Sequence, residues 1–244
     1  MMTAGGHGCI IVLMCKISLP LEYLVRKPEV DHSDDLPPML VLVHGLRSNE
    51  YDLFSLIPYL DERFIVISVR APIVLGIDQY AWYRVEFHAD RIKREVDDVE
   101  RASTQLADFV NRAVEEYGAD PKRVYLMGFS QGAMMSLALL FTHPETLAGV
   151  VSMSGALPYE ALDEVDETSK WNGFPVMVVH GVFDAVIPIA EARATRQYLK
   201  QLNTQLDYRE YPMSHQISDD SLDDVCGWLI DQLNAASEMK PGAE

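Results

Sequence analysis

The pentapeptide Gly128-Phe129-Ser130-Gln131-Gly132 contains the serine that is best placed to act as a nucleophile. It lies between residues 123–127, a short run of β-forming residues, and residues 133–140, whose composition is typical of a helix. A serine at such a sharp turn has a strained backbone, and flanking glycines remove the Cβ atoms that would clash. Its hydroxyl is exposed beside a helix N-terminus, whose partial positive charge favours a nearby oxyanion. The alternative is a glycine-bearing turn with an incidental serine.

A serine hydroxyl is a weak nucleophile at neutral pH and needs a base, which a third group orients. His215 comes four residues after the last predicted strand, whereas His143 lies at the far end of the helix that follows Ser130. Asp184 follows the preceding strand, and His180, which ends that strand, is interpreted as a packed histidine. Carboxyl ends of parallel strands meet at one edge of a sheet, so we predict that the serine, Asp184 and His215 converge there. The alternatives are a turn aspartate and a surface histidine.

Acyl transfer also needs N–H donors that stabilise the negative oxygen of the tetrahedral intermediate. Gln131 follows the serine directly, so its backbone N–H is the first candidate. The second candidate is the N–H of Leu46, in the loop after the apolar run 39–44. Gly45 lets the backbone approach a ligand closely in that loop. The alternative for this His-Gly pair is an ordinary turn at the end of a strand.

Apolar runs alternate with helical periodicity along the chain, which predicts a mostly parallel sheet covered by helices on both faces. We expect one domain over residues 1–244, with a frayed tail at 236–244. Residues 70–91 are predicted as a long loop. The predicted strands are 9–15, with 19–25 as a hairpin arm, 39–44, 64–69, 123–127, 148–153, 175–180 and 206–211. The predicted helices are 51–60, 92–117, 133–140, a short one at 160–164, 189–202 and 222–233.

The composition excludes several classes of partner. The net charge is −17, from 20 basic and 37 acidic residues, so phosphate backbones and anionic lipid surfaces are repelled. Cys9, Cys15 and Cys226 have no metal-ligand spacing and are interpreted as free thiols, without a disulfide framework. No apolar run approaches the length of a membrane span. We therefore expect a cytoplasmic protein with no metal, no cofactor, no nucleic-acid partner and no stable membrane association.

The motifs resemble the carboxylesterase/phospholipase branch of the α/β-hydrolases, which includes acyl-protein thioesterases and small bacterial carboxylesterases. The resemblance implies an α/β-hydrolase fold with no large cap domain and, in many members, a homodimer. It assigns the triad to Ser130, Asp184 and His215 and the oxyanion donors to Leu46 and Gln131. The matching blocks are spread over almost the whole chain: His44-Gly45-Leu46, Asn49-Glu50-Tyr51-Asp52, Arg70-Ala71-Pro72, Ala81-Trp82-Tyr83, residues 128–134, and residues 180–188 with His215.

Two residues depart from the family pattern. Ser214 stands before the histidine where the family often has glycine, and Arg47 stands where a small residue is usual. Ser214 bears on the shape of the loop that carries His215. Arg47 bears on the width and charge of the pocket mouth.

The sequence therefore predicts a serine hydrolase that cleaves small carboxylic esters of short to medium acyl chain through an acyl-enzyme. Acyl thioesterase and lysophospholipase activities are alternatives, and a non-catalytic binding module is the alternative of another class. The residues expected to contact the substrate are Trp82, Tyr83, Leu75, Ile187 and Met213, with core packing as the other interpretation of these side chains.

Overall fold

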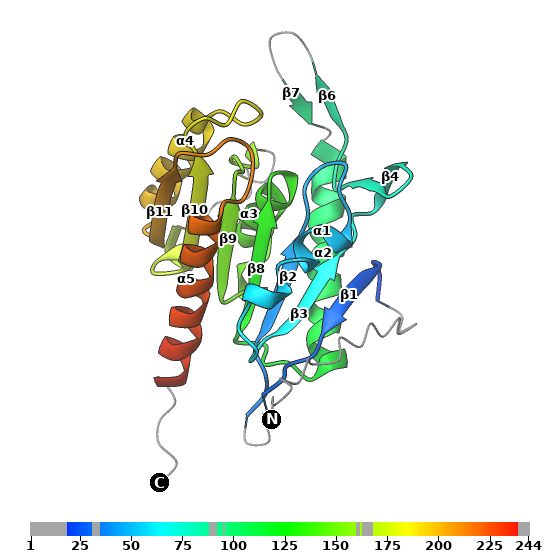
Figure 1. Ribbon diagram of the computed structural model, residues 1–244, viewed down its shortest axis with the longest axis vertical. Coiled ribbons are helices and arrows are strands. Elements are labelled where there is room, and N and C mark those ends of the chain that lie inside the picture. The colour runs from blue at the N-terminus through cyan, green and yellow to red at the C-terminus, as the bar shows by residue number, and fades with distance from the viewer. Residues whose placement is uncertain are drawn as a thin grey trace, which may run out of the picture.

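The computed structural model describes residues 19–30, 35–87, 92–94, 96–159, 162 and 168–238, and Figure 1 labels their elements. The strand predicted at 9–15 and nearly all of the helix predicted at 160–164 lie outside the described residues.

A seven-stranded sheet in the order β1-β3-β2-β8-β9-β10-β11 forms the centre of the protein (Figure 1). All neighbouring strands are parallel except β1, which pairs antiparallel with β3. The middle strands are buried along nearly their whole length, which is why they appear in the sequence as continuous apolar runs. The strands are β1 (Tyr23–Arg26), β2 (Met39–Val43), β3 (Ile65–Val69), β8 (Val124–Phe129), β9 (Gly149–Met153), β10 (Pro175–Gly181) and β11 (Gln205–Tyr211).

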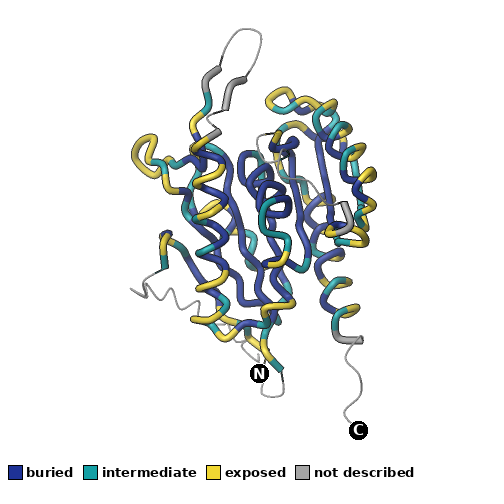
Figure 2. Tube along the Cα trace, turned by 180° about the vertical axis from the view of Figure 1, so that it is seen from behind, coloured by how far each residue is buried: buried dark blue, intermediate teal, exposed yellow. Residues whose placement is uncertain are grey.

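Helices cover both faces of the sheet, so the protein has two hydrophobic cores. Side chains alternate along β2, so that Met39, Val41 and Val43 join one core and Leu40 and Leu42 join the other. Figure 2 shows buried residues concentrated in the central strands and exposed residues on the outer helical surfaces. The first core packs under α2 (Val96–Tyr117), α3 (Gln131–Thr142) and α4 (Ile189–Gln201), and the second under α1 (Glu50–Phe54) and α5 (Asp219–Glu238). This is the predicted α/β-hydrolase fold, and no large cap is evident among the described residues.

The long loop predicted at 70–91 contains one local hairpin and the first strand of a second. One pairs β4 (Ile73–Gly76) with β5 (Gln79–Ala81), and the other pairs β6 (Val85–Phe87) with β7 (Ile92–Arg94). These strands have only three or four residues each and form two separate two-stranded sheets, and Tyr80 of β5 makes one further bridge to Ser48. As a consequence, α2 begins at Val96 rather than at Ile92.

Two other helices differ from their predicted lengths. The helix predicted at 51–60 ends at Phe54, and a 3-10 turn, Ile57–Tyr59, follows. Pro58 in that turn has no N–H and cannot continue an α-helix. Helix α5 continues to Glu238, past the point where the sequence predicts a frayed tail to begin.

Gly132 brings α3 into direct contact with β2. A Cβ atom at this position would lie 1.9 Å from the carbonyl oxygen of Val43, and one at Gly128 would lie 2.2 Å from the carbonyl oxygen of Gly132. Only hydrogen fits at either glycine, because the obstructing atoms belong to backbone and cannot rotate away. The two glycines therefore set the distance between the sheet and the N-terminus of α3.

We predict that Gly132→Ala lowers the free energy of unfolding by about 3 kcal/mol, because the added methyl forces α3 away from β2. Gly227→Ala is the matched control, since Gly227 lies in α5 and a Cβ there meets nothing within 4 Å. The control should gain roughly 0.5–1 kcal/mol from helix propensity. Urea unfolding followed by circular dichroism measures both, and equal effects of the two substitutions would contradict this account of the packing.

Candidate active site

Ser130, His215 and Asp184 lie in one chain of short contacts at the carboxyl edge of the sheet. The Nε2 atom of His215 is 2.9 Å from Ser130 Oγ, and its Nδ1 atom is 2.7 Å from Asp184 Oδ2. The serine follows β8, the aspartate follows β10, and the histidine follows β11. The structure thus brings together the three residues that the sequence places after strand ends, with the imidazole bridging hydroxyl and carboxylate.

The backbone of Ser130 has the strained geometry expected at a strand-to-helix turn. Its φ is 55° and its ψ is −116°, values that a residue with a side chain rarely adopts. Its N–H donates to the Met153 carbonyl at 2.9 Å, and its own carbonyl accepts from the Met134 N–H at 3.2 Å. Gly45 packs on the other side, where a Cβ would lie 3.3 Å from the Ser130 Cβ. The surrounding structure therefore holds the strained residue in place.

The buried carboxylate of Asp184 is held by its own loop. Its Oδ1 atom accepts from the N–H groups of Val186 at 2.9 Å and Ile187 at 2.8 Å, which leaves Oδ2 directed at His215. His180 Nε2 lies 2.8 Å from the Ile187 carbonyl and 3.4 Å from Asp184 Oδ2. Burial disfavours a charged imidazole and holds the pKa of His180 below its ordinary value. His180 is the packed histidine that its position predicts, and it closes the loop that presents Asp184.

The N–H groups predicted as oxyanion donors belong to the start of α3 and to the loop after β2, which meet at Ser130. Gln131 is the first residue of α3, where the backbone N–H groups have no partner within the helix. Leu46 lies in the turn after β2, and both residues line the same cavity as Ser130. Arg47, the next residue, has φ 63°, its N–H donates to the Tyr80 carbonyl at 2.8 Å, and its side chain is exposed. Arg47 is absent from the residues that line the cavity.

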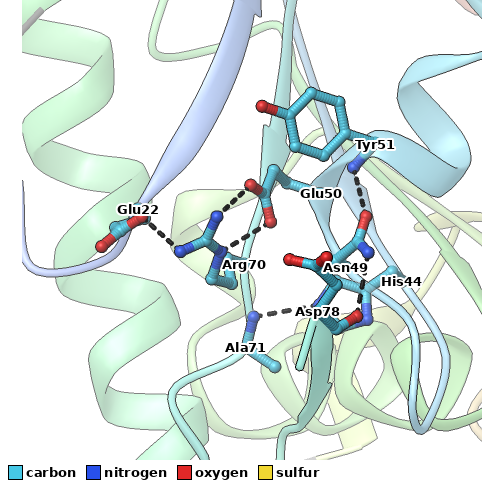
Figure 3. A network of polar contacts seen from close by, with 8 residues as sticks. All are labelled: Glu22, His44, Asn49, Glu50, Tyr51, Arg70, Ala71 and Asp78. Carbon is cyan, nitrogen blue, oxygen red and sulfur yellow. Dashed lines mark hydrogen bonds and ion pairs between the residues drawn. The ribbon is translucent and has the colours of Figure 1, made fainter. Parts of the chain in front are cut away.

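A polar network anchors the loop that carries Leu46 (Figure 3). The Ala71 N–H donates to His44 Nε2 at 3.0 Å, so the ring proton lies on Nδ1, which is 2.7 Å from the Gly45 carbonyl. Burial lowers the pKa of His44 and keeps the ring neutral. Asn49 caps α1 by accepting from the Tyr51 N–H at 3.0 Å, and its amide donates to the Asp78 carbonyl. The loop is therefore tied to both neighbouring segments.

An ion pair closes this network (Figure 3). Glu50 is only 3% exposed, and Arg70 binds both of its carboxylate oxygens. Burial alone would raise the pKa of Glu50, but the hydrogen bonds and charge of Arg70 outweigh burial and the net pKa is lowered. Arg70 also contacts Glu22 and lies over the ring of Tyr80, 4.7 Å from its centroid. One guanidinium thus joins β3, α1 and the β4–β5 hairpin.

The side chain of Gln131 forms hydrogen bonds that hold the backbone of the segment after β5. Its Oε1 accepts from the Trp82 N–H and its Nε2 donates to the Tyr83 carbonyl, both at 2.8 Å. The indole N–H of Trp82 donates to the His44 carbonyl at 2.9 Å, and the whole residue is buried. Trp82 therefore connects the segment after β5 to Gln131 and to His44 at the end of β2, and it does not line the cavity.

A cavity of about 360 Å³ opens beside Ser130. Of the residues predicted to contact substrate, Tyr83 and Ile187 line it and the other three do not. Leu75 lies on the exposed β4–β5 hairpin, and Met213 is buried in the core beneath α5. The sequence did not indicate the other lining residues. Apolar side chains at these positions look like ordinary core residues: Val85, Met134, Ala156, Tyr159, Val186 and Pro188. Glu191, which also lines the cavity, looks like a charged residue in the first turn of a helix.

Ser214 differs from the family pattern without disturbing the histidine. Its hydroxyl donates to Gln216 Oε1 at 2.9 Å, a bond within the same loop. Gly181 packs beneath that loop, since a Cβ there would lie 2.3 Å from the Met213 carbonyl oxygen. The close approach needed to seat His215 is thus made at Gly181, which leaves room for a side chain at position 214.

The chain is similar to known proteins over most of its length. Residues 27–231 match the family described as phospholipase/carboxylesterase. A protein of rice, Oryza sativa subsp. japonica, named as a probable inactive carboxylesterase, is 30% identical over 78% of this chain and 82% of its own. Acyl-protein thioesterase 1 of Schizosaccharomyces pombe is 24% identical over 82% of this chain and 92% of its own. The structure of the Bacillus cereus carboxylesterase superposes with a TM-score of 0.73 at 24% identity, covering 87% of this chain and 94% of that one.

The fold and the matched region define an esterase-type hydrolase with an α/β-hydrolase fold. The chain belongs to the phospholipase/carboxylesterase family. In the part of the chain that the structure describes, no helix has both the length and the hydropathy that crossing a bilayer requires.

We predict that Arg70→Met lowers the free energy of unfolding by about 3 kcal/mol, because it leaves the buried Glu50 carboxylate without its cation. Replacing both residues by methionine should recover most of that loss. Arg112→Met is the control, since Arg112 and Asp108 form an exposed pair on α2 that is worth less than about 1 kcal/mol. Chemical denaturation measures all four proteins, and a loss at Arg112 as large as that at Arg70 would contradict the role given to this ion pair.

We also predict a pH-dependent loss of stability from His44 and His180. Their pKa values are lowered in the folded protein, so below about 6.5 the unfolded chain takes up protons that the folded chain does not. Their contribution is therefore complete above that pH and falls as the pH drops below it. Between about pH 7.5 and about pH 5.5, the wild type should lose more free energy of unfolding than the His44→Gln, His180→Gln double variant. Parallel pH profiles from urea titrations would contradict this prediction.

Proposed function

We propose that this protein cleaves carboxylic esters of short to medium acyl chain, with Ser130 as nucleophile and a covalent acyl-enzyme as intermediate. The observation that supports it best is the contact chain from Ser130 Oγ through His215 to Asp184, at 2.9 Å and 2.7 Å. A hydroxyl, a base and an orienting carboxylate in this order are what acyl transfer requires. The family match supports serine hydrolase chemistry in general.

In the proposed reaction, His215 Nε2 takes the proton of Ser130 as the oxygen attacks the ester carbonyl. Asp184 holds Nδ1 and stabilises the imidazolium that forms. The N–H groups of Leu46 and Gln131 receive the oxyanion, and the strained serine backbone and the glycine contacts beneath it keep these donors preorganised. His215 then protonates the leaving alcohol, and water, activated by the same histidine, releases the acid.

The size and lining of the cavity support the chain-length preference. Its volume of about 360 Å³ is near the lower end of the range of roughly 300–1,000 Å³ for small-molecule sites. Tyr83, Met134 and Ile187 give it an apolar wall suited to an acyl group. A long acyl chain would extend beyond this cavity into solvent.

Thioester hydrolysis is the second candidate, favoured by the similarity to acyl-protein thioesterase 1 of S. pombe. The same residues would act on a thioester in the same order. Lysophospholipase activity is less well supported, because the net charge of −17 opposes anionic headgroups and membranes. A non-catalytic module is the alternative suggested by the name of the rice relative, and the contact chain from Ser130 to Asp184 argues against it here.

We predict that the wild type hydrolyses p-nitrophenyl acetate, butyrate and octanoate and that activity falls at palmitate. Ser130→Ala should lose at least about a thousandfold in kcat, because the nucleophile is absent. Ser136→Ala is the control, since this serine lies in α3 and its hydroxyl donates to the Gly132 carbonyl. A fluorophosphonate probe should label the wild type and the control but not Ser130→Ala.

The result that would refute the proposal is an absence of both hydrolysis and labelling in the folded wild type, which favours the binding module. Activity on acyl thioesters alone would keep the mechanism and change the substrate class. Retention of activity by Ser130→Ala would remove the serine from its role.

A further inference from the structure

Glu191 places a negative charge in the wall of the Ser130 cavity. Among the described residues that line this cavity, no other side chain is charged. Most of the lining is apolar, and the amide of Gln131 is already bound to the Trp82 N–H and the Tyr83 carbonyl. A carboxylate in such a wall loses water when a ligand enters, which costs free energy unless the ligand supplies a partner. Glu191 therefore bears on which acyl groups the cavity accepts.

No neighbour along the helix neutralises this carboxylate. A glutamate on a helix surface commonly pairs with a cation three or four residues further on, but those residues of α4 are Ala194 and Thr195. The Glu191 N–H donates to the Pro188 carbonyl, and its carbonyl accepts from the Thr195 hydroxyl, both at 2.9 Å. In the part of the chain that the structure describes, no hydrogen bond or ion pair engages the carboxylate itself.

The two arginines of α4 that lie nearest in sequence are engaged with β11 instead. Arg193 binds both carboxylate oxygens of Glu210, at 2.9 Å and 2.8 Å. Arg196 lies over the Tyr208 ring, 4.9 Å from its centroid. No residue of β11 lines the cavity, so these contacts belong to another part of the surface.

Two further arginines are adjacent in sequence to lining residues. Arg84, which follows Tyr83, forms an ion pair with the buried Asp98 at 3.4 Å. Arg47, which follows Leu46, is exposed. Neither side chain lines the cavity. Within the described residues, the negative charge in the wall thus has no matching cation there.

The loop that presents Asp184 also sets the position of Glu191. Pro188 ends this loop and precedes α4, whose first turn contains Glu191. Val186 and Pro188 line the cavity along the way. The carboxylate is therefore carried by the same rigid segment as the aspartate that contacts His215.

The lining changes from buried to exposed across the cavity. Tyr83 and Met134 are buried, whereas Val186 is 58% exposed. Glu191 is half-buried, intermediate between these two groups. An acyl chain can therefore place its methylene groups on the buried wall while its end meets the carboxylate. A charged end would keep part of its hydration there, which limits the cost of desolvating it.

A positively charged group is the partner that this wall favours. A cation gains a charge-assisted contact with the carboxylate, and the rings of Tyr83 and Tyr159 supply cation–π contacts in the same cavity. The net charge of −17 also attracts cations toward the protein. An acyl group that ends in an anion is repelled, and one that ends in an alkyl group leaves the carboxylate without a partner.

We propose that Glu191 determines specificity, and that the preferred substrates are esters whose acyl group ends in a cation such as a quaternary ammonium. This inference rests on the proposed function, because it names the substrate class of the same cavity. The ester is cleaved by the steps given above, and Glu191 acts only by binding the charged end of the acyl group.

An acidic residue in the first turn of α4 also stabilises the helix through its dipole. That role is the same whatever the substrate, so it predicts no difference between a charged and a neutral ester.

The test compares two p-nitrophenyl esters that differ in a single atom. In one the acyl group is γ-trimethylammoniobutyryl, and in the other a tert-butyl group replaces the trimethylammonium group. The ratio of their kcat/KM values, cationic over neutral, isolates the effect of charge from that of size. This ratio should be at least about tenfold lower in Glu191→Gln than in the wild type, because the substitution keeps the shape and removes the charge.

Two further variants serve as controls. Glu191→Asp keeps the charge and should retain most of the preference for the cationic ester. Glu116→Gln removes the same charge from an exposed site on α2 and should have the ratio of the wild type. A ratio that falls as far in Glu116→Gln as in Glu191→Gln would assign the effect to net charge and overturn the proposal.

The N-methylamides of the same two acids separate this inference from the hydrolytic one, since their binding needs no turnover. Titration calorimetry should show the cationic amide binding more tightly than the neutral amide to the wild type, and Glu191→Gln should lose that difference. Equal ester ratios in the wild type and Glu191→Gln would overturn the role of Glu191 and leave ester hydrolysis standing. If neither ester is cleaved, the hydrolytic proposal fails, and equal binding of the two amides would overturn this one as well.

Discussion

The approach of α3 to β2 is the constraint on which the rest of the site depends. The helix reaches the sheet at Gly132, in contact with the carbonyl of Val43, and no side chain could occupy that space. The strand that ends there continues into Gly45 and Leu46, so one contact sets the position of the serine relative to the loop that faces it. The strain of Ser130, with φ 55°, is the local cost of turning β8 into a helix so close to the sheet.

Charge and hydrogen bonding then fix the orientations of the polar side chains that packing has brought together. Arg70 satisfies a carboxylate that is 3% exposed and does so from a neighbouring strand. His44 uses its two ring nitrogens on two different backbone groups. Asp184 divides its oxygens in the same manner, one for its own loop and one for His215. Each buried polar group in these sets constrains direction as well as distance, as a preorganised site requires.

Much of this arrangement could be predicted from sequence because the order of strand-ending residues follows from the parallel topology. Ser130, Asp184 and His215 each come after a predicted strand, and the carboxyl ends of parallel strands lie together at one edge of the sheet. The cavity wall could not be predicted in that way. Leu75 and Met213 have the right chemistry, but the first lies on an exposed hairpin and the second faces the core under α5. The short β4–β5 hairpin is held by local pairing and by contacts with the loop after β2, and neither leaves a periodic pattern.

Trp82 links two parts of the site through hydrogen bonds, and these bonds couple the local unfolding of both parts. Its backbone N–H is held by the Gln131 side chain and its indole N–H by the His44 carbonyl. Displacing the segment after β5 therefore breaks bonds to the start of α3 and to the end of β2 at once. Local unfolding of this segment therefore also disturbs the site. It exposes the Trp82 indole and leaves two buried polar groups near Ser130, the Gln131 side chain and the His44 carbonyl, without their hydrogen bonds. The segment after β5, the loop after β2 and the N-terminus of α3 thus form one cooperative unit of local stability.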